Sequence, residues 1–152
     1  NNNNNSGNSS SNNNNFPSIS GVVIAKDDHV TPYEQEQLQK HNIEWYSASH
    51  PVPDQRSVSA AQRLLQVVSE TASQRTLVLC CISGGGSALF CAPAPPLTLE
   101  DLQEVNSILL ASGMNIEHMN IVRKRLELGK GGRLAASCYP SSVVALILSD
   151  VL

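Results

Sequence analysis

One segment in the middle of the chain constrains its fold and its chemistry more than any other. Residues 77–82 are aliphatic or cysteine, and they run directly into the Ser-Gly-Gly-Gly-Ser sequence of residues 83–87. A short apolar run of this kind is typical of a buried strand in a parallel sheet. Glycines at its carboxyl end let backbone N–H groups approach a ligand closely, and α/β sheets bind anions at this place. A plain flexible turn is the alternative interpretation of the glycine triplet.

Strands and helices are expected to alternate along the chain. Apolar runs predict strands over 22–25, 43–46, 77–82 and 143–148, the last two of them buried. Helices are expected over 32–40, after Asp54, after Thr98, over about 115–128, and from 133 until Pro140 ends the last one. Thr31, Asp54 and Thr98 are the predicted N-caps. This alternation is typical of an α/β fold with a mostly parallel sheet.

Two of these helices have a predicted apolar face. In the helix after Asp54 the face consists of Val58, Ala61, Leu64, Leu65 and Val68. In the helix after Thr98 it consists of Leu99, Leu102, Val105, Ile108 and Leu109. Because side chains three and four positions apart share one side of a helix, we expect both sets to be buried.

The composition limits the class of protein. A length of 152 residues suits one domain, and with only 4% aromatic residues the core must be aliphatic. A net charge of −3 does not favour a nucleic-acid partner or a membrane surface, and no apolar run is long enough to span a bilayer. None of the four cysteines forms a Cys-x-x-Cys pair, so we expect buried free thiols and a cytoplasmic location.

The two ends of the chain differ from its middle. Residues 1–15 are only Asn, Ser and Gly, and such a segment has no apolar surface to bury. We therefore expect a disordered tail over 1–19 and a folded domain over 20–152. The first residue is Asn1, and the last residues follow a strand-like run directly. We expect this chain to be a fragment of a longer protein.

Half of the basic residues lie within eleven positions of the sequence. They are Arg123, Lys124, Arg125, Lys130 and Arg133, of a total of ten. Arginine and lysine side chains suit phosphate oxygens, and the neighbouring Gly131 and Gly132 would allow backbone N–H groups to take part. A solvated helix face is the alternative interpretation of this cluster.

Several standard motifs are incomplete in this sequence. The glycine segment has Leu89 where a dinucleotide-binding fingerprint needs its third glycine, which argues against a nicotinamide cofactor. Neither Ser83 nor Ser87 lies in a Gly-x-Ser-x-Gly elbow. Asp150 follows a predicted strand, where a carboxylate holds a metal or a hydroxyl, or caps a helix. His50 lies in a stiff proline-containing loop, where a packing role is the alternative to a functional one.

Taken together, these segments resemble the type-2 glycerate kinases, whose second domain is the MOFRL domain. The similarity covers about residues 20–152, with the motifs in the family's order and spacing. The segments that carry it are Ser49–Asp54, Ile82–Leu89 with Ala92-Pro93, Leu97–Asp101, Asn120–Lys124, Lys130–Ala135 and Leu146–Val151.

The resemblance implies a Rossmann-like, three-layer α/β domain that is incomplete in this chain, and an ATP-dependent kinase that phosphorylates D-glycerate to 2-phosphoglycerate with Mg²⁺. It implies catalytic roles for Lys130, Arg123 and Asp150, with Asp150 also placing the metal. It assigns nucleotide or substrate binding to Ser83, Gly84, Gly85, Gly86, Ser87, His50, Asp54, Gly131, Gly132 and Arg133.

This chain also departs from the family pattern. Arg125 stands where histidine is usual, Glu127 where serine is usual, and Gly129 where an apolar residue is usual. The family's upstream lysine segment and its second domain have no counterpart, so we expect little or no kinase activity from this chain alone. The alternatives are a non-catalytic anion-binding or interaction module, and an acyl-transfer enzyme that uses Ser83 or Ser87 with His50.

Overall fold

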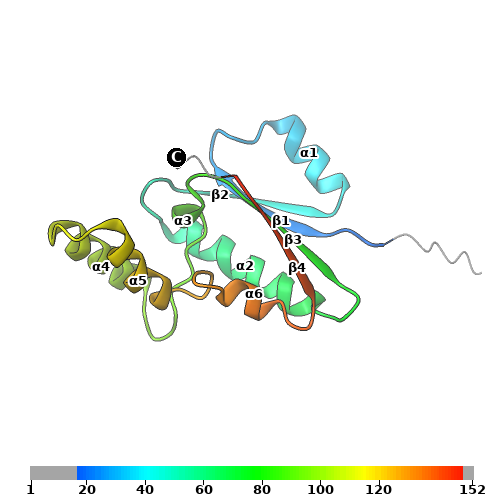
Figure 1. The fold of residues 1–152 in the computed structure, drawn as a ribbon. Coiled ribbons are helices and arrows are strands. Elements are labelled where there is room, and N and C mark those ends of the chain that lie inside the picture. Colours follow the sequence, from blue (N-terminus) through cyan, green and yellow to red (C-terminus); the bar gives the residue numbers. More distant parts are fainter. Residues whose placement is uncertain (1–16, 149–152) are drawn as a thin grey trace, which may run out of the picture.

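The computed structural model describes residues 17–148, in which helices alternate with parallel strands (Figure 1). Of the expected disordered tail, residues 1–16 lie outside the described part of the chain. Asp150 also lies outside it. The elements are β1 (Gly21–Lys26), α1 (Pro32–Lys40), β2 (Ile43–Ala48), α2 (Gln55–Thr71), β3 (Leu77–Ile82), α3 (Gly86–Leu89), α4 (Leu99–Ala111), α5 (Ile116–Leu126), α6 (Arg133–Ser137) and β4 (Ser142–Ile147).

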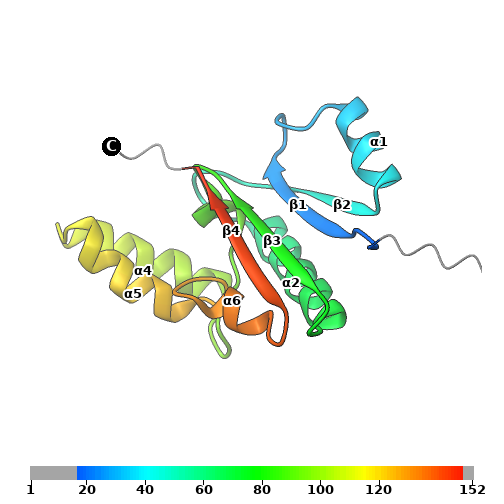
Figure 2. The same cartoon turned by 45° about the vertical axis from the view of Figure 1, so that its right-hand side comes forward.

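The strands form two parallel pairs. β1 pairs with β2, with Gly21 opposite Ile43, and β3 pairs with β4, with Leu77 opposite Ser142 (Figure 2). Each pair is joined through at least one helix, as parallel strands require. The predicted α/β fold with parallel strands is therefore confirmed, with the strands divided between two small sheets.

Three helices begin at the residues that the sequence predicts. The Thr31 hydroxyl accepts a hydrogen bond from the Glu34 N–H at 3.3 Å, and the Thr98 hydroxyl accepts one from the Asp101 N–H at 3.2 Å. The Asp54 carboxylate caps α2 in the same way, and each of the three caps forms a reciprocal capping box. An N-cap of this kind contributes about 1 kcal/mol, because it satisfies N–H groups that have no partner within the helix.

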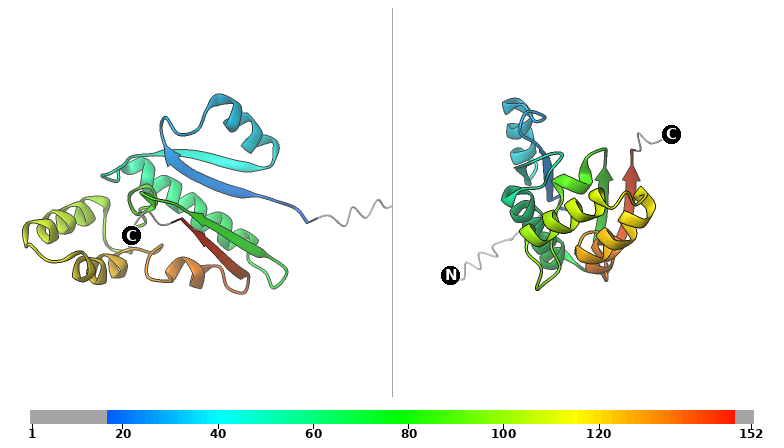
Figure 3. Two further views of the ribbon diagram at one scale, coloured as in Figure 1. Left: turned by 45° about the horizontal axis from the view of Figure 1, so that its top comes forward. Right: turned by 90° about the vertical axis from the view of Figure 1, so that its left-hand side faces the viewer.

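The core lies around α2 and the start of α4. α2 packs against β1 and β2 and buries Val58, Ala60, Ala61 and Val68. Val58 also belongs to an apolar cluster with Cys91, Leu99 and Leu102. α4 and α5 pack against each other and project away from the strands (Figure 3).

The predicted buried face of α4 was wrong at one position. Leu99, Leu102 and Leu109 are buried and Val105 is half-buried, but Ile108 is exposed. Successive residues of a helix are rotated by about 100° from each other, so Ile108 lies on the side of α4 opposite the buried Leu99. Ile108 therefore points away from the side that buries Leu109.

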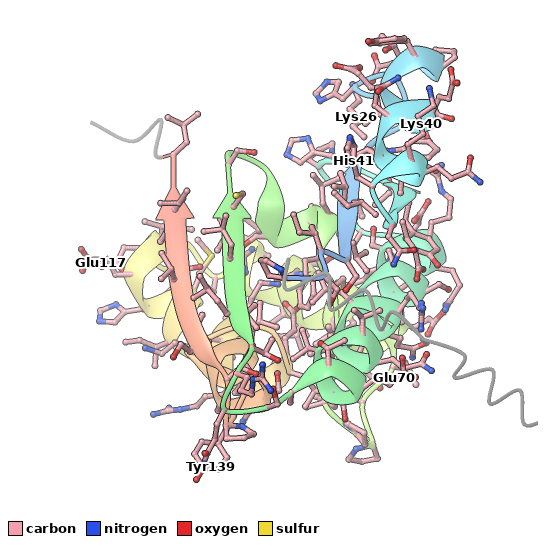
Figure 4. All side chains as sticks on the ribbon, turned by 90° about the vertical axis from the view of Figure 1, so that its right-hand side faces the viewer. Lys26, Lys40, His41, Glu70, Glu117 and Tyr139 are labelled. Carbon is pink, nitrogen blue, oxygen red and sulfur yellow. The ribbon has the colours of Figure 1, made fainter. Side chains whose placement is uncertain are left out.

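The predicted burial of β3 and β4 was also wrong. Leu79 and Cys81 lie opposite Val144 and Leu146 in the register, and all four side chains are exposed. In Figure 4 the two strands stand side by side with no helix drawn across them. The apolar sequence predicted the strands correctly, but within residues 17–148 no element covers this face.

The cysteines, like the strand residues, include both buried and exposed side chains. All four are free thiols, as expected, with Cys91 and Cys138 buried and Cys80 half-buried. Burial raises the pKa of the Cys91 thiol to about 11, so it remains protonated near neutral pH. Cys81 is exposed, which corrects the prediction that all the thiols are buried.

Candidate functional site

The glycine loop after β3 turns directly into a short helix that the sequence analysis did not predict. Gly85 has φ +79° and stands at the N-cap of α3. A Cβ atom on Gly85 would lie 2.9 Å from both Cδ2 and Nε2 of the His50 imidazole. Glycine is therefore required here twice, for the left-handed backbone and for the close approach of the histidine ring.

This contact joins two of the predicted site segments. His50 lies just beyond the carboxyl end of β2, and residues 83–87 lie just beyond the carboxyl end of β3. Carboxyl ends of parallel strands are where α/β proteins place their ligands, so the meeting of these loops supports a site here. Among residues 17–148, the structure shows no hydrogen bond between His50 and either serine of the loop. The acyl-transfer alternative therefore gains no support.

Lys130 connects the glycine loop to the basic segment more than forty residues further along the chain. Its ammonium group donates to the carbonyl oxygens of Ser87, at 3.0 Å, and Phe90, at 3.4 Å. It also donates to the carboxylate of Glu127. An ammonium has three N–H donors, so these three acceptors use all of them. Lys130 thus holds both ends of α3 in place.

Glu127 is the partner that makes this arrangement possible. It is only 8% exposed, and its second carboxylate oxygen accepts a hydrogen bond from the Ala92 N–H at 3.3 Å. The adjoining backbones are also paired, because Ala94 N donates to Leu126 O at 2.8 Å and Leu128 N donates to Ala92 O at 2.7 Å. A buried carboxylate needs such partners, since an unpaired buried charge is strongly unfavourable.

Two departures from the family pattern find a physical reason at this place. Glu127, where serine is usual, is the buried carboxylate that pairs with Lys130. Gly129, where an apolar residue is usual, lies against the Phe90 ring, and a Cβ on it would be 1.8 Å from Phe90 Cε1. The glycine therefore leaves the space that the phenylalanine ring fills.

The other predicted residues have local partners. Gly131 and Gly132, with φ +62° and +85°, lead into α6, and the Arg133 side chain donates to Glu127 O at 3.4 Å. Arg123 Nε donates to Asn106 Oδ1 at 2.7 Å, which ties α5 to α4.

Asp54 is engaged at the start of α2. It accepts from the Ser57 N–H at 3.2 Å and from Arg56 Nε at 2.8 Å. Burial alone would raise the pKa of Asp54, but the hydrogen bonds from Arg56 and Ser57 outweigh it and hold this pKa below its usual value.

A shallow cavity of about 430 Å³ lies at the carboxyl ends of β3 and β4, beside the first residue of the glycine loop. Its lining is mostly apolar and consists of Cys81, Ile82, Ser83, Leu146, Ile147 and Leu148. In the part of the chain that the structure describes, no group of three or more His, Cys, Asp or Glu side chains is arranged to hold a metal ion. No helix of the described part is long and apolar enough to cross a bilayer.

Comparison with known families decides the assignment. Residues 8–152 match the family described as "Domain of unknown function (DUF4147)". The chain belongs to the DUF4147 family. This match covers nearly the whole chain, and it corresponds to the N-terminal domain of the glycerate 2-kinase family. The resemblance drawn from the sequence motifs is thereby confirmed.

Among the relatives is a D-glycerate 2-kinase from Thermotoga maritima, 43% identical over 134 residues, which are 88% of this chain and 32% of the relative. An Agrobacterium vitis protein named "Putative hydroxypyruvate reductase" is 46% identical over 133 residues, again 88% of this chain and 32% of the relative. A glycerate kinase from Rattus norvegicus is 44% identical over 122 residues, 78% of this chain and 23% of the relative. The chain thus spans about a third or less of these relatives.

The fold agrees with a solved relative. The crystal structure of a glycerate kinase from Thermotoga maritima superposes with a TM-score of 0.74 at 35% identity, over 91% of this chain and 38% of that one. A Pyrococcus horikoshii OT3 protein superposes with the same TM-score, 0.74, at 29% identity, over 89% of this chain and 34% of that one. The α/β architecture described above is therefore that of the glycerate kinase N-terminal domain.

Proposed function

We propose that this chain supplies the glycine-loop part of an ATP-dependent D-glycerate 2-kinase. The reaction transfers the γ-phosphoryl group of ATP to the 2-hydroxyl of D-glycerate and forms 2-phosphoglycerate and ADP. One observation carries the proposal: His50, the 83–87 loop and Lys130 come from three distant segments and meet beyond the strands. Each of these segments carries a family motif, and the Thermotoga maritima relative is named for this reaction.

The contacts suggest how the residues divide the work. The backbone N–H groups of residues 84–86 are the proposed donors to an anionic group, either a phosphate or the glycerate carboxylate. Lys130 keeps this loop in place, and its positive charge also lies beside it. Arg133 is exposed, and its guanidinium donates to the carbonyl oxygen of Glu127, whose carboxylate pairs with Lys130, so we propose Arg133 as a direct phosphate contact.

Mg²⁺ bound with a nucleotide takes only one or two protein carboxylates, with phosphate and water as its other ligands. The lack of a larger carboxylate cluster among residues 17–148 is compatible with such a metal. We propose Asp150, which lies outside the described residues, as its protein ligand. The ion would neutralise charge on the transferred phosphoryl group.

The name of the Agrobacterium vitis relative raises a competing function, the reduction of hydroxypyruvate. A nicotinamide-dependent reductase commonly binds its cofactor with a Gly-x-Gly-x-x-Gly segment. The glycine segment of this chain has Leu89 at the third position, within α3. This residue favours the kinase over the reductase. A non-catalytic anion-binding module is the second alternative.

The decisive experiment uses a chimera, since we expect the chain alone to form little or no product. Residues 20–152 replace the matching third of the Thermotoga maritima D-glycerate 2-kinase. Phosphorus NMR then follows ATP, Mg²⁺ and D-glycerate, and a parallel assay follows NADH with hydroxypyruvate. A 2-phosphoglycerate signal with no NADH oxidation supports the kinase. The unmodified Thermotoga enzyme is the positive control. If that enzyme is active and the folded chimera forms no phosphoglycerate, the result favours the non-catalytic module. Oxidation of NADH favours the reductase.

A further inference from the structure

The loop that carries His50 is stiff, but little within the loop itself holds it in place. Residues 50–53 follow the carboxyl end of β2, and the two prolines among them have no backbone N–H group. Three of these four residues are exposed, so apolar packing contributes little to their position. The His50 ring nevertheless lies so close to the glycine loop that a Cβ on Gly85 would be 2.9 Å from its Cδ2 atom. A contact from another element is needed to fix this arrangement.

That contact comes from Gln103, near the start of α4. Its side-chain amide donates a hydrogen bond to the Pro53 carbonyl oxygen at 2.9 Å, and this bond is partly buried. Among the hydrogen bonds within residues 17–148, it is the only one that involves residues 50–53. Gln103 is therefore the hydrogen-bonding link between this loop and the rest of the domain.

The position of Gln103 is itself fixed by the packing of its neighbours in the helix. Leu99 and Leu102 belong to the apolar cluster that also contains Val58 and Cys91. Val58 lies near the start of α2, and Cys91 lies two residues beyond the end of α3. Because a packed cluster of this kind is rigid, it gives Gln103 a defined place relative to both the 50–53 loop and the glycine loop.

We propose that Gln103 is a positioning residue of the candidate site, and that its hydrogen bond to Pro53 holds the His50 ring against Gly85. The effect on catalysis rests on the proposed kinase function, since the alignment of the two loops matters only if they contact nucleotide or substrate. Misplacement of such a contact by about 1 Å can reduce a rate by about 100-fold. Loss of this one bond should therefore change activity far more than it changes the stability of the fold.

Proton NMR of the full chain tests the contact without measuring activity. The Hδ2 proton of His50 should show a nuclear Overhauser effect to the Hα protons of Gly85, and His50→Gln identifies this cross-peak. Gln103→Met removes the amide donor but retains a similar side-chain length and preference for helix. We expect this variant to lose the cross-peak and to lower the unfolding temperature by no more than about 4 °C.

Gln62→Met is the matched control, because Gln62 is exposed on α2 and the substitution is the same. It should retain the cross-peak. Gln103→Glu repeats the test with a side chain of the same shape that only accepts hydrogen bonds near neutral pH. Persistence of the cross-peak in both Gln103 variants would overturn the proposal. So would its loss in Gln62→Met, because the cross-peak would then report general loosening of the chain.

The chimera with the Thermotoga maritima D-glycerate 2-kinase tests the consequence for catalysis. We expect Gln103→Met to lower kcat/KM for D-glycerate at least about tenfold, and Gln62→Met to leave it within about twofold. An active chimera that Gln103→Met leaves unchanged would overturn the positioning role. An unmodified chimera without activity would count against the proposed kinase, while the NMR comparison would still decide whether Gln103 positions His50.

Discussion

The two parallel strand pairs of this protein are built alike but are covered very differently. In β1 and β2 every side chain is at least half-buried, because α1 packs against β2 and α2 packs against both strands. In β3 and β4 most side chains are exposed, although these strands are more apolar in sequence. Hydrophobic sequence therefore specifies a strand, while its burial depends on which helices are present to pack against it.

The two strand pairs also differ in the kind of contact that stabilises them and their loops. The covered pair is held by apolar packing, with Ala48, Ala60 and Ala61 allowing close contact. The loop beyond the exposed pair is held by polar contacts, chiefly those of Lys130 with Glu127, Ser87 and Phe90. The sheet with the exposed face thus carries the glycine loop beyond its strand ends, and the ion pair of Lys130 and Glu127 holds that loop.

The largest expected effect comes from breaking that ion pair. Lys130→Met leaves the Glu127 carboxylate buried without its cation and leaves two carbonyl groups of the α3 segment without a donor. We expect a loss of about 3–5 kcal/mol in the free energy of unfolding, measured by urea denaturation. Lys124→Met is the matched control on an exposed position, with an expected change within about 0.5 kcal/mol. Similar values for the two variants would show that polar contacts do not hold this loop.

The same substitution in both sheets tests the comparison itself. Ala48 in β2 is 0% exposed, so Ala48→Leu should overpack the core and cost about 1–3 kcal/mol. Ala145 in β4 is exposed, so Ala145→Leu should change the unfolding free energy by no more than about 0.5 kcal/mol. Urea denaturation of both variants provides the measurement. Equal costs would mean that β4 is covered as well as β2.

The smallest expected effect concerns the charged contact between α2 and β2. Hydrogen bonds from Arg63 and then from Tyr46 lower the pKa of Glu44 from its usual value near 4.5 to about 2. This pair therefore stabilises the fold fully above pH 4.5, and the contribution is lost as the pH falls toward 2. Because the pair is partly exposed, we expect less than about 1 kcal/mol.

Thermal unfolding between pH 5 and pH 2 checks this expectation for Glu44. Glu44→Gln should be less stable than the unmodified chain at pH 5, with the difference shrinking toward pH 2. Glu36→Gln, on the exposed side of α1, serves as the control. A constant difference across this range would contradict the assignment to the Arg63 pair.

Local signals in the sequence predicted much of the fold. Thr31, Asp54 and Thr98 each cap the helix that follows them, because an N-cap depends only on residues within one turn. The glycine loop and its left-handed Gly85 were indicated for the same reason. The exposed position of Ile108 and the bare face of β3 depend on neighbours distant in the sequence, which periodicity does not specify.

The sequence named the candidate site residues but not the contacts between them. Sequence reasoning named His50, the 83–87 loop and Lys130, and the structure brings them together. It did not predict the pairing of Glu127 with Lys130, or the contact of Phe90 with Gly129. A lone acidic residue three positions before Lys130 was the available signal, since residues at this spacing can pair on one face.

Hydrogen exchange of the backbone amides tests most directly the claim that the β3–β4 sheet lacks a covering layer on its exposed face within residues 17–148. Mass spectrometry would compare peptides covering β1 and β2 with peptides covering β3 and β4, in the chain and in the chimera with the Thermotoga maritima enzyme. We predict that β3 and β4 exchange faster than β1 and β2 in the chain, and that the chimera removes this difference. Equal protection of both pairs in the chain alone would contradict the account.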